Sequence, residues 1–209
     1  MNLETGDILL FQHNQNYKSC YNCFFSLFTG CIKCCTDSKY SHAAIVVKDP
    51  DFRDFKRKGL FILESSFEAF PDAVDHKYKL GVELEEFDKV LRDARRHGEV
   101  YYRKLSCVRN NEFYTKLSET YDLVKNKPYD CLPKDWISAL LHRTTGDEAQ
   151  SARHFWCSAL VAFIYVKWGF LDQTVPWSYI TPKMLGTEKN EFPLKYINCT
   201  VSPETLLEI

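Results

Sequence analysis

Runs of apolar residues at two different spacings divide the 209-residue chain into predicted strands and helices. Short apolar or alternating runs bounded by turn residues predict β-strands at 6–11, 42–48, 59–64, 67–70, 81–87, 100–105 and 192–199. Apolar residues at helical spacing predict helices at 88–97, at 110–125, at 136–141, from Cys157 to Gly169, and from Pro182 onward. Segment 51–58 is predicted as a loop or short helix, and 202–207 as a capped turn. This mixture, without an internal repeat, predicts a single α+β domain over residues 1–209.

The helix that begins at Cys157 is the first candidate for chemistry. Leu160, Val161 and Ile164 recur along it at helical spacing, so it is expected to be buried on at least one side. A thiol in the first turn lies near unpaired backbone N–H groups and the positive end of the helix dipole, and both lower its pKa. Cys157 is therefore a candidate nucleophile; the alternative is a small buried core residue, as most free cysteines are.

Two polar residues on predicted strands can complete such a site. His42 stands at the start of the 42–48 strand, where an imidazole can be half buried and still reach a neighbour as a general base. Glu64 ends the apolar run 60–63, and a carboxylate there either lies exposed at the strand end or orients a histidine. An activated cysteine needs these three residue types: a nucleophile, a base, and a group that fixes the imidazole tautomer.

Composition and charge exclude some classes of protein. Apolar residues make up 45% of the chain and aromatic residues 15%, which indicates a folded globular protein rather than a disordered one. The formal net charge of -1 gives no field that would attract nucleic acid, and the charged residues between 83 and 97 are predicted to form a solvated helical face. No signal peptide or membrane-spanning run is recognised, and nine cysteines without an export signal favour the reducing cytoplasm.

A segment rich in cysteine and phenylalanine, at about 13–38, allows three interpretations. It contains two C-x-x-C pairs, formed by Cys20 with Cys23 and by Cys31 with Cys34, and Cys35 follows directly. Buried free thiols are the first interpretation, because the pairs are too close together for the common zinc ribbons and fingers. A zinc site is the second, and S-acylation or peripheral membrane contact of the Phe/Cys patch is the third.

Five short blocks occur in one order along the chain: Gly6-Asp7-Ile8-Leu9, Tyr40-Ser41-His42-Ala43-Ala44-Ile45, Leu63-Glu64-Ser65-Ser66, Lys127-Pro128-Tyr129-Asp130 and Cys157-Ser158-Ala159-Leu160-Val161. With these blocks the chain resembles the circularly permuted papain-like thiol hydrolases of the NlpC superfamily. It is most similar to YiiX-like members and more distantly to lecithin–retinol acyltransferase-like proteins. The histidine precedes the cysteine, which is the mark of the permutation.

The resemblance implies a fold and roles for particular residues. The fold is a small antiparallel sheet, often barrel-like, packed on the helix that carries the cysteine. Cys157 corresponds to the family nucleophile, His42 to the base and Glu64 to the polar third member. Tyr129 corresponds to a position near the cleft, which makes it a candidate for substrate binding, and Asp7 is expected to be structural. No cofactor is implied, and no metal ligands are assigned.

The expected activity is a cysteine-dependent hydrolase that attacks an amide, ester or thioester through a thioester acyl-enzyme. The substrate would be a peptide or a lipid acyl group, and nucleic acid is not expected as a partner. A lipid acyltransferase with the same three residues, or a non-catalytic binding module on the same fold, are the alternatives. The sequence does not indicate an oligomeric state.

Overall fold

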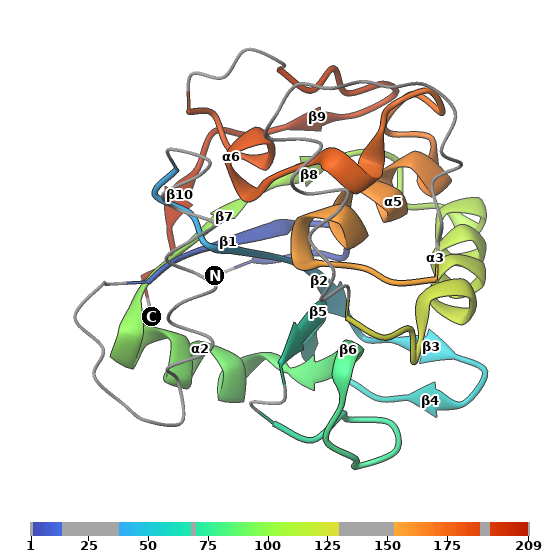
Figure 1. The fold of residues 1–209 in the computed structure, drawn as a ribbon. Helices are drawn as coiled ribbons and strands as arrows, with labels where there is room; N and C mark the ends of the chain where they lie inside the picture. The colour runs from blue at the N-terminus through green and yellow to red at the C-terminus, as the bar shows by residue number, and fades with distance from the viewer. Residues whose placement is uncertain (1, 14–37, 68–69, 130–152, 189–192, 209) are drawn as a thin grey trace.

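The computed structural model describes residues 2–13, 38–67, 70–129, 153–188 and 193–208, and it is built around a six-stranded sheet (Figure 1). The strand order is β10-β7-β1-β2-β5-β6, and every neighbouring pair is antiparallel. The strands of this sheet are β1 (Ile8–His13), β2 (His42–Lys48), β5 (Leu60–Phe67), β6 (Leu80–Glu86), β7 (Gly98–Arg103) and β10 (Thr205–Leu206).

Two short pairings and several helices complete the described structure. β3 (Asp51–Phe52) pairs with β4 (Phe55–Lys56), and β8 (Leu105–Ser106) pairs with β9 (Thr200–Val201). The α-helices are α2 (Phe87–His97), α3 (Asn111–Val124), α5 (Cys157–Trp168) and the short α6 (Pro182–Leu185), and a 3-10 turn covers η2 (Trp177–Tyr179). The predicted mixed α/β class with an antiparallel sheet is therefore confirmed. None of the helices in the described ranges is long and apolar enough to cross a bilayer.

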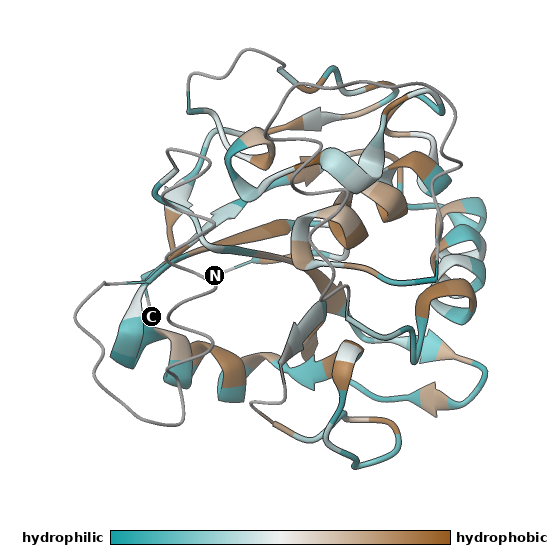
Figure 2. Ribbon diagram, in the orientation of Figure 1, coloured by the Kyte–Doolittle hydropathy of each residue, from teal (hydrophilic) through white to brown (hydrophobic). Residues whose placement is uncertain are grey.

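Alternation along the central strands creates an apolar layer on each face of the sheet. On one face Ile8, Leu10 and Ile45 join the core formed with α5 and α3. On the other face Leu9 and Val46 pack with α2, whose buried residues recur at helical spacing: Phe87, Val90, Leu91 and Ala94. Figure 2 shows the central strands largely in hydrophobic colours, whereas α2 and α3 carry both colours. Because strands covered on both sides have no solvent face, these strands are apolar throughout.

Helix α5 lies inside this arrangement rather than on its surface. Ten of its residues are buried, on all sides of the helix, as expected for a helix enclosed by other elements. It contacts β2 and β5 on one side and α3, α6 and η2 on others. Gly169 ends the helix with a left-handed φ of 79°, a conformation that glycine adopts without the steric cost of a Cβ atom. The predicted helix from Cys157 to Gly169 is confirmed, as is the helix over 110–125.

Four predictions for short segments are wrong. Segment 51–58 contains the β3–β4 pairing instead of a loop or helix, and segment 202–207 contains β10 instead of only a turn. The strand predicted over 192–199 is not observed in its described part, since β9 begins at Thr200; the one predicted over 67–70 does not extend to Phe70. β9 and β10 pair with β8 and β7, which lie about a hundred residues earlier, so local periodicity cannot define them.

Other predictions lie outside the described residues. Only His13 and Ser38 of the Cys/Phe-rich segment 13–38 are described, so its thiol, zinc and membrane interpretations remain predictions. The same holds for the short helix predicted over 136–141.

Candidate active site

Cys157 is the first residue of α5 and is 2% exposed. The preceding residue, Trp156, has an extended backbone and donates its indole N–H to the carbonyl of Ile180 at 3.2 Å. The sulfur of Cys157 accepts hydrogen bonds from the backbone N–H groups of Ala43, in β2, and of Ser158, in the helix itself. The Cys157 sulfur therefore contacts both the start of β2 and the N-terminus of α5.

His42 is the first residue of β2 and bridges Glu64 and Cys157. Its Nε2 lies 2.5 Å from Oε2 of Glu64, in β5, and the imidazole is also hydrogen-bonded to the Cys157 side chain. Since Nε2 faces the carboxylate, Nδ1 is the ring nitrogen left for the sulfur. The Phe11 ring, 5.1 Å away between centroids and tilted by 57°, packs against the imidazole. The structure therefore brings together the three residues that the sequence nominated.

The electrostatics of this group favour charge separation between sulfur and imidazole. Burial raises the pKa of the Cys157 thiol, but the adjacent His42 imidazolium outweighs burial and lowers that pKa below its ordinary value. Burial also disfavours the imidazolium, yet Glu64 and Cys157 raise the pKa of His42 to about 10. Burial opposes ionisation of Glu64 as well, and His42 keeps the pKa of that carboxyl lowered. The arrangement favours a thiolate–imidazolium pair held by a carboxylate.

Contacts from β5 and from the segment after α3 fix the chain just before Cys157. The hydroxyl of Ser65, next to Glu64, donates to the carbonyl of Phe155 at 2.6 Å. The N–H of Phe155 donates to the carbonyl of Pro128 at 3.2 Å. Gly81 allows the segment at Pro128 to approach β6, because a Cβ there would lie 2.2 Å from the carbonyl oxygen of residue 127. The orientation of Cys157 relative to Glu64 is thus set by backbone contacts as well as by His42.

Tyr129 is also part of this junction. It is 6% exposed, forms a parallel bridge with Phe155, and donates its N–H to the carbonyl of Leu80 at 3.1 Å. It directly follows Pro128, whose carbonyl accepts the Phe155 N–H, and it belongs to the α5-side core. Its predicted role in substrate binding stays a prediction.

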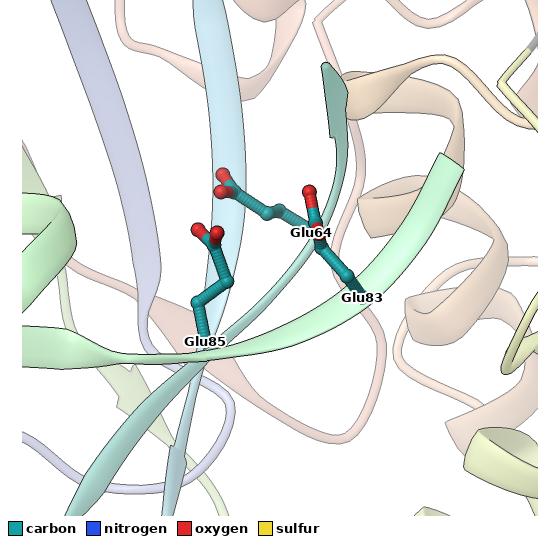
Figure 3. Close-up of side chains that lie close together, drawn as sticks. All are labelled: Glu64, Glu83 and Glu85. Carbon is teal, nitrogen blue, oxygen red and sulfur yellow. The ribbon is translucent and has the colours of Figure 1, made fainter. Parts of the chain in front are cut away.

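Two further carboxylates lie beside Glu64. Glu83 is paired with Glu64 across β5 and β6, and Glu85 lies two residues farther along β6 on the same face (Figure 3). Each of the three is at most 3% exposed, and one oxygen from each lies within 4.8 Å of the others. Glu85 and Glu64 are hydrogen-bonded to each other. Burial, then repulsion from Glu64, raise the pKa of Glu85 to about 11, so Glu85 is the protonated partner of this pair.

Among the described residues, this triplet of carboxylates is also the grouping whose spacing would suit a cation. Carboxylate oxygens suit hard divalent ions. Glu64, however, already accepts a hydrogen bond from His42 and shares another with Glu85, so protons account for two of the three members.

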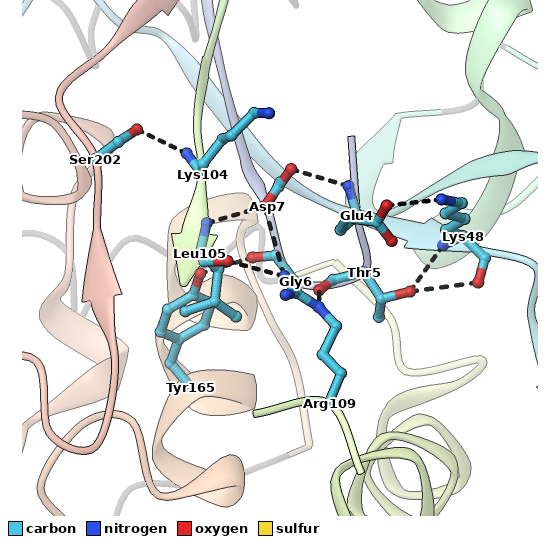
Figure 4. Close-up of polar contacts among 10 residues, drawn as sticks. All are labelled: Glu4, Thr5, Gly6, Asp7, Lys48, Lys104, Leu105, Arg109, Tyr165 and Ser202. Carbon is cyan, nitrogen blue, oxygen red and sulfur yellow. Dashed lines mark hydrogen bonds and ion pairs between the residues drawn. The ribbon is translucent and has the colours of Figure 1, made fainter. Parts of the chain in front are cut away.

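Asp7 is structural, as predicted. Its Oδ2 accepts from the N–H of Glu4 at 3.0 Å and its Oδ1 from the N–H of Leu105 at 2.9 Å (Figure 4). Burial raises the pKa of Asp7 despite these two donors and the nearby Arg109 guanidinium. The carboxylate ties the entry of β1 to β8, and the Tyr165 hydroxyl of α5 donates to the adjacent Gly6 carbonyl at 2.7 Å.

The sequence missed the residues that support the three candidates. Glu83 and Glu85 were assigned to a solvated charged face, which is wrong: both are 1% exposed. The available signal was the alternation Val82-Glu83-Leu84-Glu85, which places both glutamates on one face of a strand. Ser65 had no signal beyond its place after Glu64.

Comparisons with known proteins add little to this site. No protein-family model matches the chain, and no curated protein does. Among solved structures, the metalloprotein YiiX from Escherichia coli O157:H7 is similar at 19% sequence identity. The match covers 100% of this chain and 98% of that chain, with a TM-score of 0.46. This likeness is too weak to assign a family, a metal or an activity.

Proposed function

We propose that this protein is a cysteine-dependent hydrolase that acts on an acyl group through a thioester intermediate. The observation that carries the proposal is the linked arrangement of Cys157, His42 and Glu64, in which a buried thiol at a helix N-terminus has a lowered pKa. Under this proposal Cys157 is the nucleophile, His42 the acid and base, and Glu64 the group that holds the imidazole.

In the proposed reaction, the Cys157 thiolate attacks the acyl carbonyl carbon and a tetrahedral oxyanion forms. The His42 imidazolium then gives its proton to the leaving amine, alcohol or thiol, and the thioester remains on Cys157. Neutral His42 next takes a proton from water, which attacks the thioester and releases the carboxylic acid and the cysteine. The backbone N–H of Cys157 is proposed as one oxyanion donor, since helix N-termini present unpaired N–H groups.

The permuted papain-like fold is part of the same proposal. Support comes from the chain order histidine, glutamate, cysteine and from the packing of α5 on an antiparallel sheet. The proposed substrate class is a peptide amide or a lipid ester or thioester. An acyltransferase would differ only in the acceptor that replaces water.

The test is the pH profile of iodoacetamide labelling at each cysteine, measured by peptide mass spectrometry. Because Cys157 is nearly buried, the profile is more diagnostic than the absolute rate. We expect the Cys157 profile to begin well below pH 9, whereas Cys107 and Cys199, whose pKa values burial raises, should label only at higher pH. The variant His42→Ala should lower the Cys157 rate at pH 6 by about tenfold or more, since one pKa unit is a tenfold change in thiolate.

His154→Ala is the matched control, because His154 is exposed and three residues before Cys157; it should leave the profile unchanged. Labelling of Cys157 with the profile of an ordinary thiol would leave a non-catalytic binding module. An active thiol that transfers acyl groups to an added alcohol or amine faster than to water would favour the acyltransferase.

A further inference from the structure

Glu85 lies beside Glu64 and has no assigned role in the proposed reaction. Glu64 can hold the His42 imidazole only while its Oε2 faces Nε2, and both carboxylate oxygens are buried with the side chain, at 3% exposure. Glu64 lies within β5 rather than at its end, but its side chain has several rotatable bonds, so this orientation needs a second contact. Figure 3 shows the Glu85 carboxyl group directed toward that of Glu64.

Two hydrogen-bonded carboxyl groups must share a proton, because an ionised carboxylate has only acceptor oxygens. Glu64 faces the imidazole of His42, which favours its ionised form, whereas the described groups that act on Glu85 are Glu64, Glu83 and a backbone N–H from Phe70. Two carboxyl groups in such different surroundings separate into one ionised and one neutral group. The proton therefore belongs on Glu85.

The remaining surroundings of Glu85 agree with a neutral acid. The helix packed on this side of the sheet, α2, buries only apolar residues: Phe87, Val90, Leu91 and Ala94. Within the described residues no N–H or hydroxyl donor reaches the buried Oε1 of Glu85, which costs less for a neutral acid than for a carboxylate. Among the described titratable groups, His13 also acts on Glu64 and lowers the pKa of its carboxyl.

We infer that Glu85 is a positioning residue for the acyl-transfer site: as a neutral carboxylic acid it donates a hydrogen bond to the Glu64 carboxylate and so fixes Glu64 against His42. This inference rests on the proposed function and adds a fourth member to its chain of contacts. Glu85 does not touch the reacting atoms, and its effect reaches Cys157 through Glu64 and His42.

The experiment compares three variants by the pH profile of Cys157 labelling. Glu85→Leu removes the donor, so Glu64 loses a contact that lowers its pKa, and labelling at pH 6 should fall about tenfold. Glu85→Gln keeps a neutral N–H donor and should stay within about threefold of the wild-type rate. Glu83→Leu is the matched control, since it removes an equally buried glutamate from the same face of β6; it should also stay within about threefold.

A second measurement keeps the inference testable if a leucine variant does not fold. The infrared difference spectrum of wild-type protein against Glu85→Gln at pH 7 should contain the carbonyl band of a protonated carboxylic acid. Absence of that band would mean that Glu85 is ionised and has no proton to donate to Glu64.

Three results would overturn the inference: a wild-type profile retained in Glu85→Leu, absence of the acid band, or a stoichiometric divalent cation in the purified protein that is lost in Glu85→Gln. Failure of the proposed function is a separate result. If the proposed function is wrong, His42→Ala will leave the pH profile of Cys157 labelling unchanged, and Glu85 will have no effect on catalysis. The infrared band would still show whether Glu85 carries the proton.

Discussion

The thiol of Cys157 gains reactivity from a few groups that are themselves buried. In water a thiol seldom transfers its proton to an imidazole, because their ordinary pKa values favour the neutral pair. Here the buried Glu64 carboxylate favours the imidazolium of His42, and the imidazolium favours the thiolate. Since burial opposes each of these charges, the three groups depend on one another, and removal of one partner is costly for the others.

A different buried carboxylate, Asp7, should affect stability without affecting the thiol. It accepts two backbone N–H groups, and Asp7→Asn replaces one acceptor oxygen by an NH2 group that faces a donor. We expect a loss of about 1–3 kcal/mol in unfolding free energy, which denaturant titration measures. The pH profile of Cys157 labelling should be that of the wild type.

Asp88→Asn is the control for Asp7→Asn, because Asp88 is exposed in the first turn of α2 and should cost less than about 1 kcal/mol. A shifted Cys157 profile in Asp7→Asn, at unchanged stability, would contradict the structural role of Asp7.

At the scale of elements, the sequence predicts what local periodicity determines. The helix α3 was predicted with its buried face, because Phe113, Leu117, Tyr121 and Val124 repeat at helical spacing and Asn110 caps the start. The strands β9 and β10 were missed, because each exists only through a partner about a hundred residues earlier in the sequence.

The same division holds for the candidate site. Cys157, His42 and Glu64 each stand at the start or end of a predicted element. A polar residue in such a position, next to an apolar run, can be recognised in the sequence as a candidate site residue. Glu85 alternates with apolar residues, as a residue on a solvent-exposed strand face also would. Only the packing of α2 on that face shows that it is buried.

The β8–β9 pairing makes a prediction about two other thiols. Ser106 lies opposite Thr200, so the next residues, Cys107 and Cys199, are directly opposite each other, and both are free thiols. The N–H of Ser202 donates to the carbonyl of residue 104 at 2.9 Å, which identifies 104/202 and 106/200 as hydrogen-bonded pairs. Cys107 and Cys199 therefore form a non-hydrogen-bonded pair, whose Cα separation of about 4.5 Å falls within the range of disulfides.

We expect glutathione disulfide to join Cys107 and Cys199. The two thiols lose two protons and two electrons, and the glutathione disulfide is reduced to two glutathione thiols. Peptide mapping should find the linked pair, and the closed loop of roughly 90 residues should raise unfolding free energy by about 2–4 kcal/mol relative to Cys107→Ser under the same conditions. Recovery of both peptides as separate glutathione adducts would contradict the register.

At the scale of the whole molecule, ionisable groups are enclosed between two apolar layers. The layer with α5 places the thiol at one end of β2, and the layer with α2 covers the carboxylates of β5 and β6. A buried group whose pKa differs between folded and unfolded chain makes stability depend on pH. The carboxylates Glu64, Glu83 and Glu85 should therefore make the unfolding free energy depend on pH, whether or not the protein is an enzyme.

The sign for Glu85 is opposite to that of a salt-bridged acid. Its pKa is about 11 in the folded chain and near 4.5 in the unfolded chain, so between these values only the unfolded chain releases the proton. Stability is therefore lost as pH rises above about 4.5, by up to about 1.4 kcal/mol per pH unit for one proton. The glutamine side chain in Glu85→Gln cannot ionise, so this variant should not lose unfolding free energy in this way as the pH rises.

We accordingly expect the unfolding free energy of Glu85→Gln, relative to the wild type, to increase steadily from pH 5 to pH 8 in urea titrations. Glu86→Gln serves as control, because Glu86 is half-buried beside Arg57 and its pKa is lowered by Lys89 and Arg57, so its removal should leave the relative stability almost independent of pH over that range. A pH-independent difference for Glu85→Gln would mean that Glu85 is ionised in the folded chain, and the proton between Glu64 and Glu85 would then have to be replaced by a cation.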